Sequence, residues 1–156
     1  MSLSQKTRIA VVGTGRVGIS QGVLKNAEIM ELAGIVESNH ELADKVAQNY
    51  NTRAYYSVED GLSDPSIDAF IISLPQFLHF PIGKQILEAG RHVLIEKPLG
   101  LNLCEVRELI RTADEHNVYV MAAQSRRFYR AIQYAKNLLP EIDGPTNMLY
   151  NFACIF

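Results

Sequence analysis

Cysteine is scarce in this 156-residue sequence, which contains only Cys104 and Cys154. The two lie far apart and form no C-x-x-C pair. Two isolated thiols provide neither a disulfide framework nor the ligand set of a zinc site. We therefore expect no bound metal and no disulfide network.

Long apolar runs and an excess of one charge are also absent. No run is long enough to span a membrane, and the first residues lack the apolar core of a signal peptide. Lys and Arg number 15 against 17 Asp and Glu, which leaves a formal net charge of -2. This balance gives no attraction to nucleic acid or to an anionic membrane. We expect a cytoplasmic protein with neither partner.

Disorder is excluded by composition, because 47% of the residues are hydrophobic and 21% are charged, as in ordinary globular domains. What stands out instead is a glycine-rich turn, G-T-G-R-V-G, directly after the apolar residues 9–12. Gly13 permits a tight turn, Gly15 lets the backbone approach a pyrophosphate, and Gly18 lets a helix pack close to the sheet. A helix beginning near Arg16 would direct its N-terminal N–H groups at the anion. The turn therefore predicts a dinucleotide site.

A carboxylate, Glu37, closes the next apolar run, nineteen residues after Gly18. A ribose hydroxyl acceptor is expected at this distance. The glycine pattern alone is weak evidence, and a turn without a ligand is the alternative reading. Glu37 can accept from both ribose hydroxyls and would repel a 2′-phosphate, and residues 38–40 offer no arginine to offset that repulsion. We expect NAD rather than NADP.

Strand-like and helix-like segments alternate along the chain. The expected strands are residues 9–12, 30–37, 53–56, 67–73, 92–95 and 118–122. Helices are expected after the glycine turn, after 38–39, over 57–62, after 79, and after a capping box of Asn102 and Glu105. Six strands alternating with helices predict an α/β fold, a doubly wound parallel sheet of order 3-2-1-4-5-6. We assign residues 1–124 to this dinucleotide-binding domain.

The pattern changes after residue 124. Residues 125–139 are predicted to be one helix, and 146–156 a strand. Alternate residues of this strand place three aromatic side chains on one apolar face. We interpret 125–156 as the truncated start of a second, α+β domain. The apolar face predicts a homo-dimer or higher oligomer through residues 146–156; folding back onto the nucleotide domain, or disorder, are the alternatives.

With these features in place, the chain resembles the N-terminal domain of the Gfo/Idh/MocA family, named after glucose-fructose oxidoreductase, inositol dehydrogenase and rhizopine catabolism. The resemblance covers about residues 7–156. It rests on the glycine turn, on the loop with Pro75 and His79, and on Glu96-Lys97-Pro98, in that order. It implies a Rossmann fold that binds NAD(P).

The resemblance also implies roles for single residues. Lys97 would meet the reacting hydroxyl of a sugar or polyol, and the loop with Pro75 and His79 would lie near the nicotinamide. Chemistry supports a lysine here, since hydride transfer from an alcohol needs a group that takes the hydroxyl proton. The alternatives are a surface lysine paired with Glu96, and a capping or packing role for His79. The residues expected at the cofactor are Gly13, Gly15, Arg16, Val17, Gly18, Glu37, Ser73, Pro75, His79, Glu96, Lys97 and Pro98.

Two functions from different classes remain open. The first is the NAD-binding domain of an oxidoreductase that acts on the CH-OH group of a sugar, polyol or sugar acid. Family enzymes continue into a second domain with an Asp-x-x-x-His pair, so we expect these 156 residues alone to be inactive. The second is a non-catalytic module that binds a nicotinamide nucleotide or dimerises.

Overall fold

The computed structural model describes residues 6–14 and 27–138. The chain divides into two compact units, Met1–Ala123 and Gln124–Phe156, and each is described by itself. The helix expected after the glycine turn, and the strand expected at 146–156, lie outside the described residues. Self-association through 146–156 therefore stays a prediction.

The first unit is built on a six-stranded sheet in the order β3-β2-β1-β4-β5-β6. Every neighbouring pair of strands is parallel. The predicted strand order is confirmed, and no strand end differs from the expected one by more than two residues. The strands are β1 Thr7–Val12, β2 Met30–Val36, β3 Arg53–Tyr55, β4 Ala69–Ile72, β5 His92–Ile95 and β6 Val120–Ala122.

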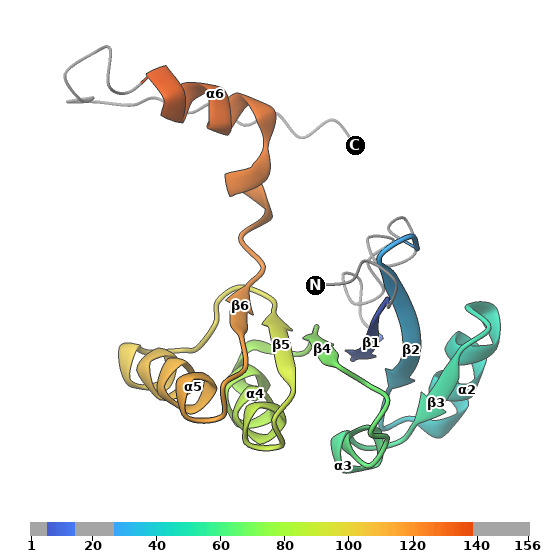
Figure 1. Ribbon diagram of the computed structural model, residues 1–156. Coiled ribbons are helices and arrows are strands. Elements are labelled where there is room, and N and C mark those ends of the chain that lie inside the picture. Colours follow the sequence, from blue (N-terminus) through green and yellow to red (C-terminus); the bar gives the residue numbers. More distant parts are fainter. Residues whose placement is uncertain (1–5, 15–26, 139–156) are drawn as a thin grey trace. The chain divides into compact units, whose positions relative to one another are not determined.

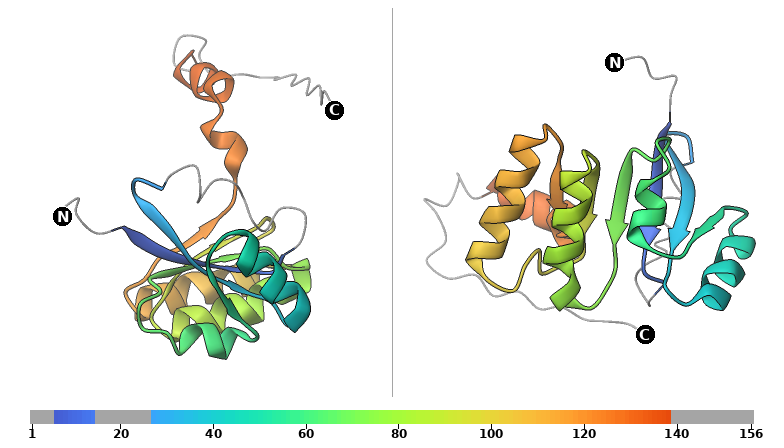
Figure 2. Two further views of the ribbon diagram at one scale, coloured as in Figure 1. Left: turned by 90° about the vertical axis from the view of Figure 1, so that its right-hand side faces the viewer. Right: turned by 90° about the horizontal axis from the view of Figure 1, so that it is seen from below.

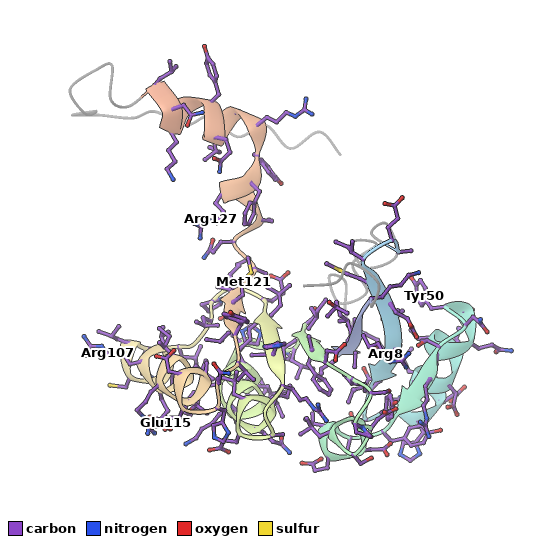
Figure 3. All side chains as sticks on the ribbon, viewed as in Figure 1. Arg8, Tyr50, Arg107, Glu115, Met121 and Arg127 are labelled. Atoms are coloured by element: carbon purple, nitrogen blue, oxygen red, sulfur yellow. The ribbon has the colours of Figure 1, made fainter. Side chains whose placement is uncertain are left out.

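In the described residues, helices connect each strand from β2 onward to the next one. In Figure 2 the helices α3, α4 and α5 lie side by side on one face of the sheet. The helix α2 packs on β2 and β3 (Figure 1), and Arg107 and Glu115 stand on the outer surface of α5 (Figure 3). The described helices of this unit are α2 His40–Asn49, α3 Val58–Leu62, the 3-10 turn η1 Gln76–Leu78, α4 His79–Glu88 and α5 Leu103–Glu115.

The core lies between the sheet and the row of α3, α4 and α5. It consists of aliphatic side chains from alternate strand positions, together with the inward residues of these helices. Burial of such side chains is the main stabilising contribution to a domain of this size. Members of the core include Ala10, Val12, Phe70, Ile72, Ile86, Leu87, Val93, Ile95 and Leu109.

The predicted helix signals are confirmed at several ends. Asn39 caps α2 by accepting from the Leu42 N–H at 3.0 Å. Asn102 caps α5 by accepting from the Glu105 N–H at 3.0 Å, and Glu105 accepts in return from the Asn102 side chain at 2.9 Å. Gly90, just past α4, has a φ of 72°, which suits glycine.

The second unit corrects one prediction. The helix expected over 125–139 is divided into a 3-10 turn, η2 Ser125–Phe128, and the helix α6 Arg130–Leu138. Tyr129 separates them with an extended backbone at ψ 134°. Its carbonyl accepts from the Gln133 N–H at 3.0 Å, so Tyr129 takes the position of the N-cap of α6. The hydrophobic residues keep a helical period on both sides of Tyr129, so the sequence pattern does not reveal that this one residue is extended.

Two kinds of feature are absent from the part of the chain that the structure describes. No helix among residues 6–14 and 27–138 is long and apolar enough to cross a membrane. The same residues hold no group of three or more His, Cys, Asp and Glu side chains that could bind a metal ion.

Candidate functional site

Those predicted site residues that the structure describes lie at or near the edge of the sheet where the strands end. The hydrogen bonding of β1, β2, β4 and β5 continues for one residue beyond the end of each strand, and this places the following residues next to one another. The N–H groups of Gly13, Glu37, Ser73 and Glu96 donate to the carbonyls of Val36, Tyr55, Val12 and Ile72, at 2.9 to 3.0 Å. Ligands of open α/β sheets bind at this edge.

Gly13 shows why the turn needs glycine. Its φ is 91°, and an added Cβ atom would lie 2.4 Å from the Ser73 carbonyl oxygen. A larger residue would therefore clash with the backbone of the neighbouring loop as well as strain its own. Gly15, Arg16, Val17 and Gly18, the other expected phosphate contacts, lie outside the described residues.

Glu37 is held in place by four donors. One carboxylate oxygen accepts from the Thr14 hydroxyl at 2.8 Å and from the Thr14 N–H at 3.3 Å. The other accepts from the Ser38 hydroxyl at 3.3 Å and from the Asn39 N–H at 3.1 Å. The sequence did not identify Thr14 as a site residue. The glycine pattern places Thr14 between Gly13 and Gly15, but it does not show that the Thr14 side chain contacts Glu37.

The same contacts determine the ionisation of Glu37. Partial burial raises the pKa of the carboxyl, but the hydrogen bonds from Thr14, Asn39 and Ser38 outweigh it and place the pKa below its ordinary value of 4.5. Glu37 is therefore a fixed anion at neutral pH, as a ribose hydroxyl acceptor requires.

A cavity of about 190 Å³ opens beside Glu37. Its lining is mostly apolar and includes a few polar groups. This combination suits a nucleoside, which has a flat ring system and a polar sugar. Its lining is Val12, Gly13, Val36, Glu37, Ser38, Tyr56, Ser57, Val58, Leu74 and Leu78. Tyr56, Leu74 and Leu78 were not predicted as site residues, because their types alone do not distinguish a wall from the core.

The motif Glu96-Lys97-Pro98 follows β5 at the same edge. The Lys97 side chain is exposed, and Glu96 is half-buried. One Glu96 carboxylate oxygen accepts from the Lys97 backbone N–H at 3.2 Å, and the peptide bond between Lys97 and Pro98 is cis. The described structure thus leaves the ammonium group of Lys97 accessible to a ligand at the strand end.

The loop after β4 divides into an exposed part and a buried part. Pro75 is exposed and precedes η1, and its carbonyl accepts from the Leu78 N–H at 2.9 Å. His79 is 1% exposed, and both of its ring nitrogens lie within hydrogen-bond distance of backbone carbonyls. Of the two readings of His79, a structural role fits this environment better than a direct contact with the cofactor.

These features fit a dinucleotide. Gly13 leaves the space that a backbone approach to phosphates needs, and the cavity with Glu37 suits the adenosine half. Glu37 follows β2 and Glu96 follows β5, three strand spacings apart, which is about 14 Å. An extended dinucleotide separates its two nucleosides on this scale.

Comparisons with known proteins agree with this geometry. The family model GFO_IDH_MocA, described as an oxidoreductase family with an NAD-binding Rossmann fold, matches residues 7–124. The chain is 36% identical to UDP-N-acetylglucosamine 3-dehydrogenase of Acidithiobacillus ferrooxidans, over 83% of this chain and 40% of that protein. It is 34% identical to trans-1,2-dihydrobenzene-1,2-diol dehydrogenase of Xenopus tropicalis, over 71% of this chain and 34% of that protein.

One solved structure has a fold similar to that of this chain. It is the WlbA dehydrogenase of Bordetella pertussis in complex with NADH and UDP-GlcNAcA, with a TM-score of 0.80 and 26% identity, covering 88% of this chain and 42% of that one. This chain therefore spans about two fifths of the length of such relatives. With a family model matched over most of its length, the chain belongs to the Gfo/Idh/MocA oxidoreductase family, of which it carries the NAD-binding Rossmann fold.

Proposed function

We propose that this chain is the NAD-binding part of an oxidoreductase that acts on the CH-OH group of a sugar, a polyol or a sugar acid. The observation that carries the proposal is that Glu37, with its cavity, and Lys97 follow two strands of the same sheet edge. In this proposal, Glu37 is the ribose acceptor at one end of the dinucleotide, and Lys97 is the proton-transfer group at the other end.

Each residue then has a chemical task. Glu37 accepts hydrogen bonds from the adenosine ribose, and Gly13 gives the pyrophosphate room to approach the backbone. Ser73 and Pro75 border the path between the two nucleosides. Nicotinamide, when bound, supplies the hydride acceptor or donor. Lys97 takes or returns the proton of the substrate hydroxyl, and Glu96 fixes the backbone from which Lys97 projects.

The relatives support the substrate class. One is named for oxidation of a UDP-linked amino sugar at carbon 3, and one structure contains NADH together with UDP-GlcNAcA. Another is named as a dehydrogenase of a diol. All three are dehydrogenases by name, and the substrate or bound sugar nucleotide that each name gives carries hydroxyl groups.

Activity is expected to require more than these residues. Positioning a second reactant contributes about 7 to 11 kcal/mol in favourable cases. The chain spans about two fifths of its relatives, and its described residues offer Lys97 as the proton-transfer group at the sheet edge. We infer that the 156-residue polypeptide binds NADH but turns over little substrate by itself.

Calorimetric titration with NADH tests the proposal. Gly13→Ala is expected to abolish binding, because the added Cβ atom lies 2.4 Å from the Ser73 carbonyl oxygen. Gly90→Ala is the matched control: Gly90 also has a positive φ, but nothing lies within 4 Å of its added Cβ atom, and it lies past α4, at the opposite edge of the sheet. Failure of the unmodified chain to bind NADH, or unchanged binding by Gly13→Ala, would contradict the proposal.

A further inference from the structure

His79 is one of two buried polar residues in the described part of the first unit; the other is Thr112. His79 is the first residue of α4. Its Nδ1 lies 2.7 Å from the Pro98 carbonyl oxygen, and its Nε2 lies 2.9 Å from the Leu74 carbonyl oxygen. Both ring nitrogens thus face an oxygen atom of the backbone.

Carbonyl oxygens only accept hydrogen bonds, and a neutral imidazole has a single N–H group. Both contacts are therefore hydrogen bonds only if both ring nitrogens carry protons. In a neutral ring, one nitrogen lone pair would face an oxygen lone pair at less than 3 Å. The two distances also fall in the range of charge-assisted N–H···O bonds, which offset part of the cost of burying a cation.

His92 provides a contrast within the same sheet. It is half-buried at the start of β5, and its Nδ1 accepts from the backbone N–H of Tyr119 at 3.1 Å. That bond requires an unprotonated Nδ1, so His92 suits the neutral ring. The two histidines therefore have opposite requirements, set by whether their backbone partners accept or donate.

The partners of His79 belong to two different loops of the site. Leu74 follows β4, lines the cavity and precedes Pro75. Pro98 follows β5 and is joined to Lys97 by the cis peptide bond. The His79 side chain thus contacts the backbone of both loops.

We propose that His79 is a positioning residue, which carries a proton on each ring nitrogen and ties the carbonyl of Leu74 to that of Pro98. The tie fixes the loop that carries Lys97 relative to the loop that carries Pro75, and so shapes the nicotinamide half of the site. This inference rests on the proposed function, because it assumes that the nicotinamide lies between these loops.

Two variants each keep one half of the tie. The amide nitrogen of asparagine lies near the position of Nδ1, so His79→Asn keeps the bond to Pro98. The amide nitrogen of glutamine lies near Nε2, so His79→Gln keeps the bond to Leu74. Thr112→Val is the control, because it removes another buried polar contact, from Thr112 Oγ1 to the Glu108 carbonyl at 2.9 Å in α5.

The readout is the ratio of NADH affinity to ADP-ribose affinity, since ADP-ribose lacks only the nicotinamide. Both His79 variants are expected to weaken NADH binding about 10-fold relative to ADP-ribose binding, as for one lost hydrogen bond to a buried group. Thr112→Val is expected to lower stability without changing the ratio. An unchanged ratio in His79→Asn and His79→Gln would overturn the inference, whereas an unmodified chain that binds neither ligand would overturn the proposed function itself.

A second measurement does not depend on how the variants fold. Nitrogen-15 NMR of the imidazole rings in the unmodified chain at neutral pH reports which ring nitrogens carry protons. We expect both nitrogens of His79 to be protonated, and one nitrogen of His92. A His79 ring with one protonated nitrogen would overturn the inference, whatever the binding data show.

Discussion

At the residue scale, the proposed choice of cofactor depends on the carboxylate of Glu37, which has four hydrogen-bond donors within the chain. A carboxylate has about four lone-pair positions, so ribose hydroxyls must replace some of these donors. The Ser38 hydroxyl, at 3.3 Å, is the weaker of the two side-chain donors and the easier one to replace. The Thr14 hydroxyl, at 2.8 Å, is expected to keep the carboxylate in place.

NADH is expected to bind in preference to NADPH, because the Glu37 anion repels a 2′-phosphate and no arginine follows it in residues 38–40. Glu37→Ala is expected to reduce the preference at least about 10-fold, which corresponds to about 1.4 kcal/mol. Glu37→Gln is the matched control, since it keeps the shape and removes only the charge. Calorimetric titration with both cofactors measures the effect, and equal or tighter NADPH binding by the unmodified chain would show the assignment to be wrong.

The lowered pKa of Glu37 predicts how the stability of the fold depends on pH. Hydrogen bonds lower the folded-state pKa of Glu37 below 4.5 despite its partial burial. A lowered pKa stabilises the fold above the unfolded-state value, and this contribution is lost as the pH falls through the folded value. An NMR titration should therefore show Glu37 ionised at pH 4.5, and Thr14→Val should raise its midpoint. A midpoint at or above 4.5 in the unmodified chain would contradict the observed contacts.

At the element scale, the close packing of α4 depends on Gly83. A Cβ atom at this position would lie 2.7 Å from Ile95 Cδ1 and 3.3 Å from Leu109 Cδ2, and both of these side chains are fully buried. Glycine thus lets the helix approach β5 and α5 directly below the strand end that carries Lys97. Ile95 is the last residue of β5 and is followed by Glu96 and Lys97. We therefore expect the packing of Gly83 against Ile95 to influence the position of Lys97.

Gly83→Val is expected to lower the free energy of unfolding by about 2 to 3 kcal/mol, because it forces extra methyl groups into a filled core. Glu88→Val, at an exposed position of the same helix, introduces valine where the core is not filled and should cost less than about 1 kcal/mol. Urea denaturation followed by circular dichroism compares the two. Equal losses in both variants would mean that packing around Gly83 is not the cause.

The sequence was most informative about the helices and strands. Apolar runs located all six strands, and the side-chain caps Asn39 and Asn102 act as predicted. The break at Tyr129 could not be predicted, since it depends on one backbone ψ angle inside a continuous helical period. Patterns of residue type specify faces and ends well, but they do not specify single dihedral angles.

At the scale of the whole molecule, the strand order and the position of the site edge followed from strand–helix alternation alone. The side-chain contacts between loops at that edge could not be predicted from this alternation. The contact of Thr14 with Glu37 and the position of His79 between Leu74 and Pro98 join residues of different loops. A motif gives the residue types at the edge, whereas the partner of each side chain depends on how the loops fold over it.

The division of the chain gives the last prediction. The described core cluster is formed by residues 10 to 113, with further packing from as far as Val120. The last hydrogen bond into the sheet runs from the Ala123 N–H to the Ile95 carbonyl, at 2.8 Å. We therefore propose that residues 1–124 form a domain that folds without the residues that follow it.

A chain that ends at Gln124 is expected to keep its free energy of unfolding within about 1 kcal/mol, and its NADH affinity within about twofold. The control is a chain that ends at Glu115, which loses β6 together with the packing of Val118 and Val120 on the core, and which should fail to fold. Urea denaturation and NADH titration on both chains decide the matter. If the chain that ends at Gln124 aggregates or no longer binds NADH, residues 125–156 are part of the nucleotide-binding fold, and the boundary at 124 is wrong.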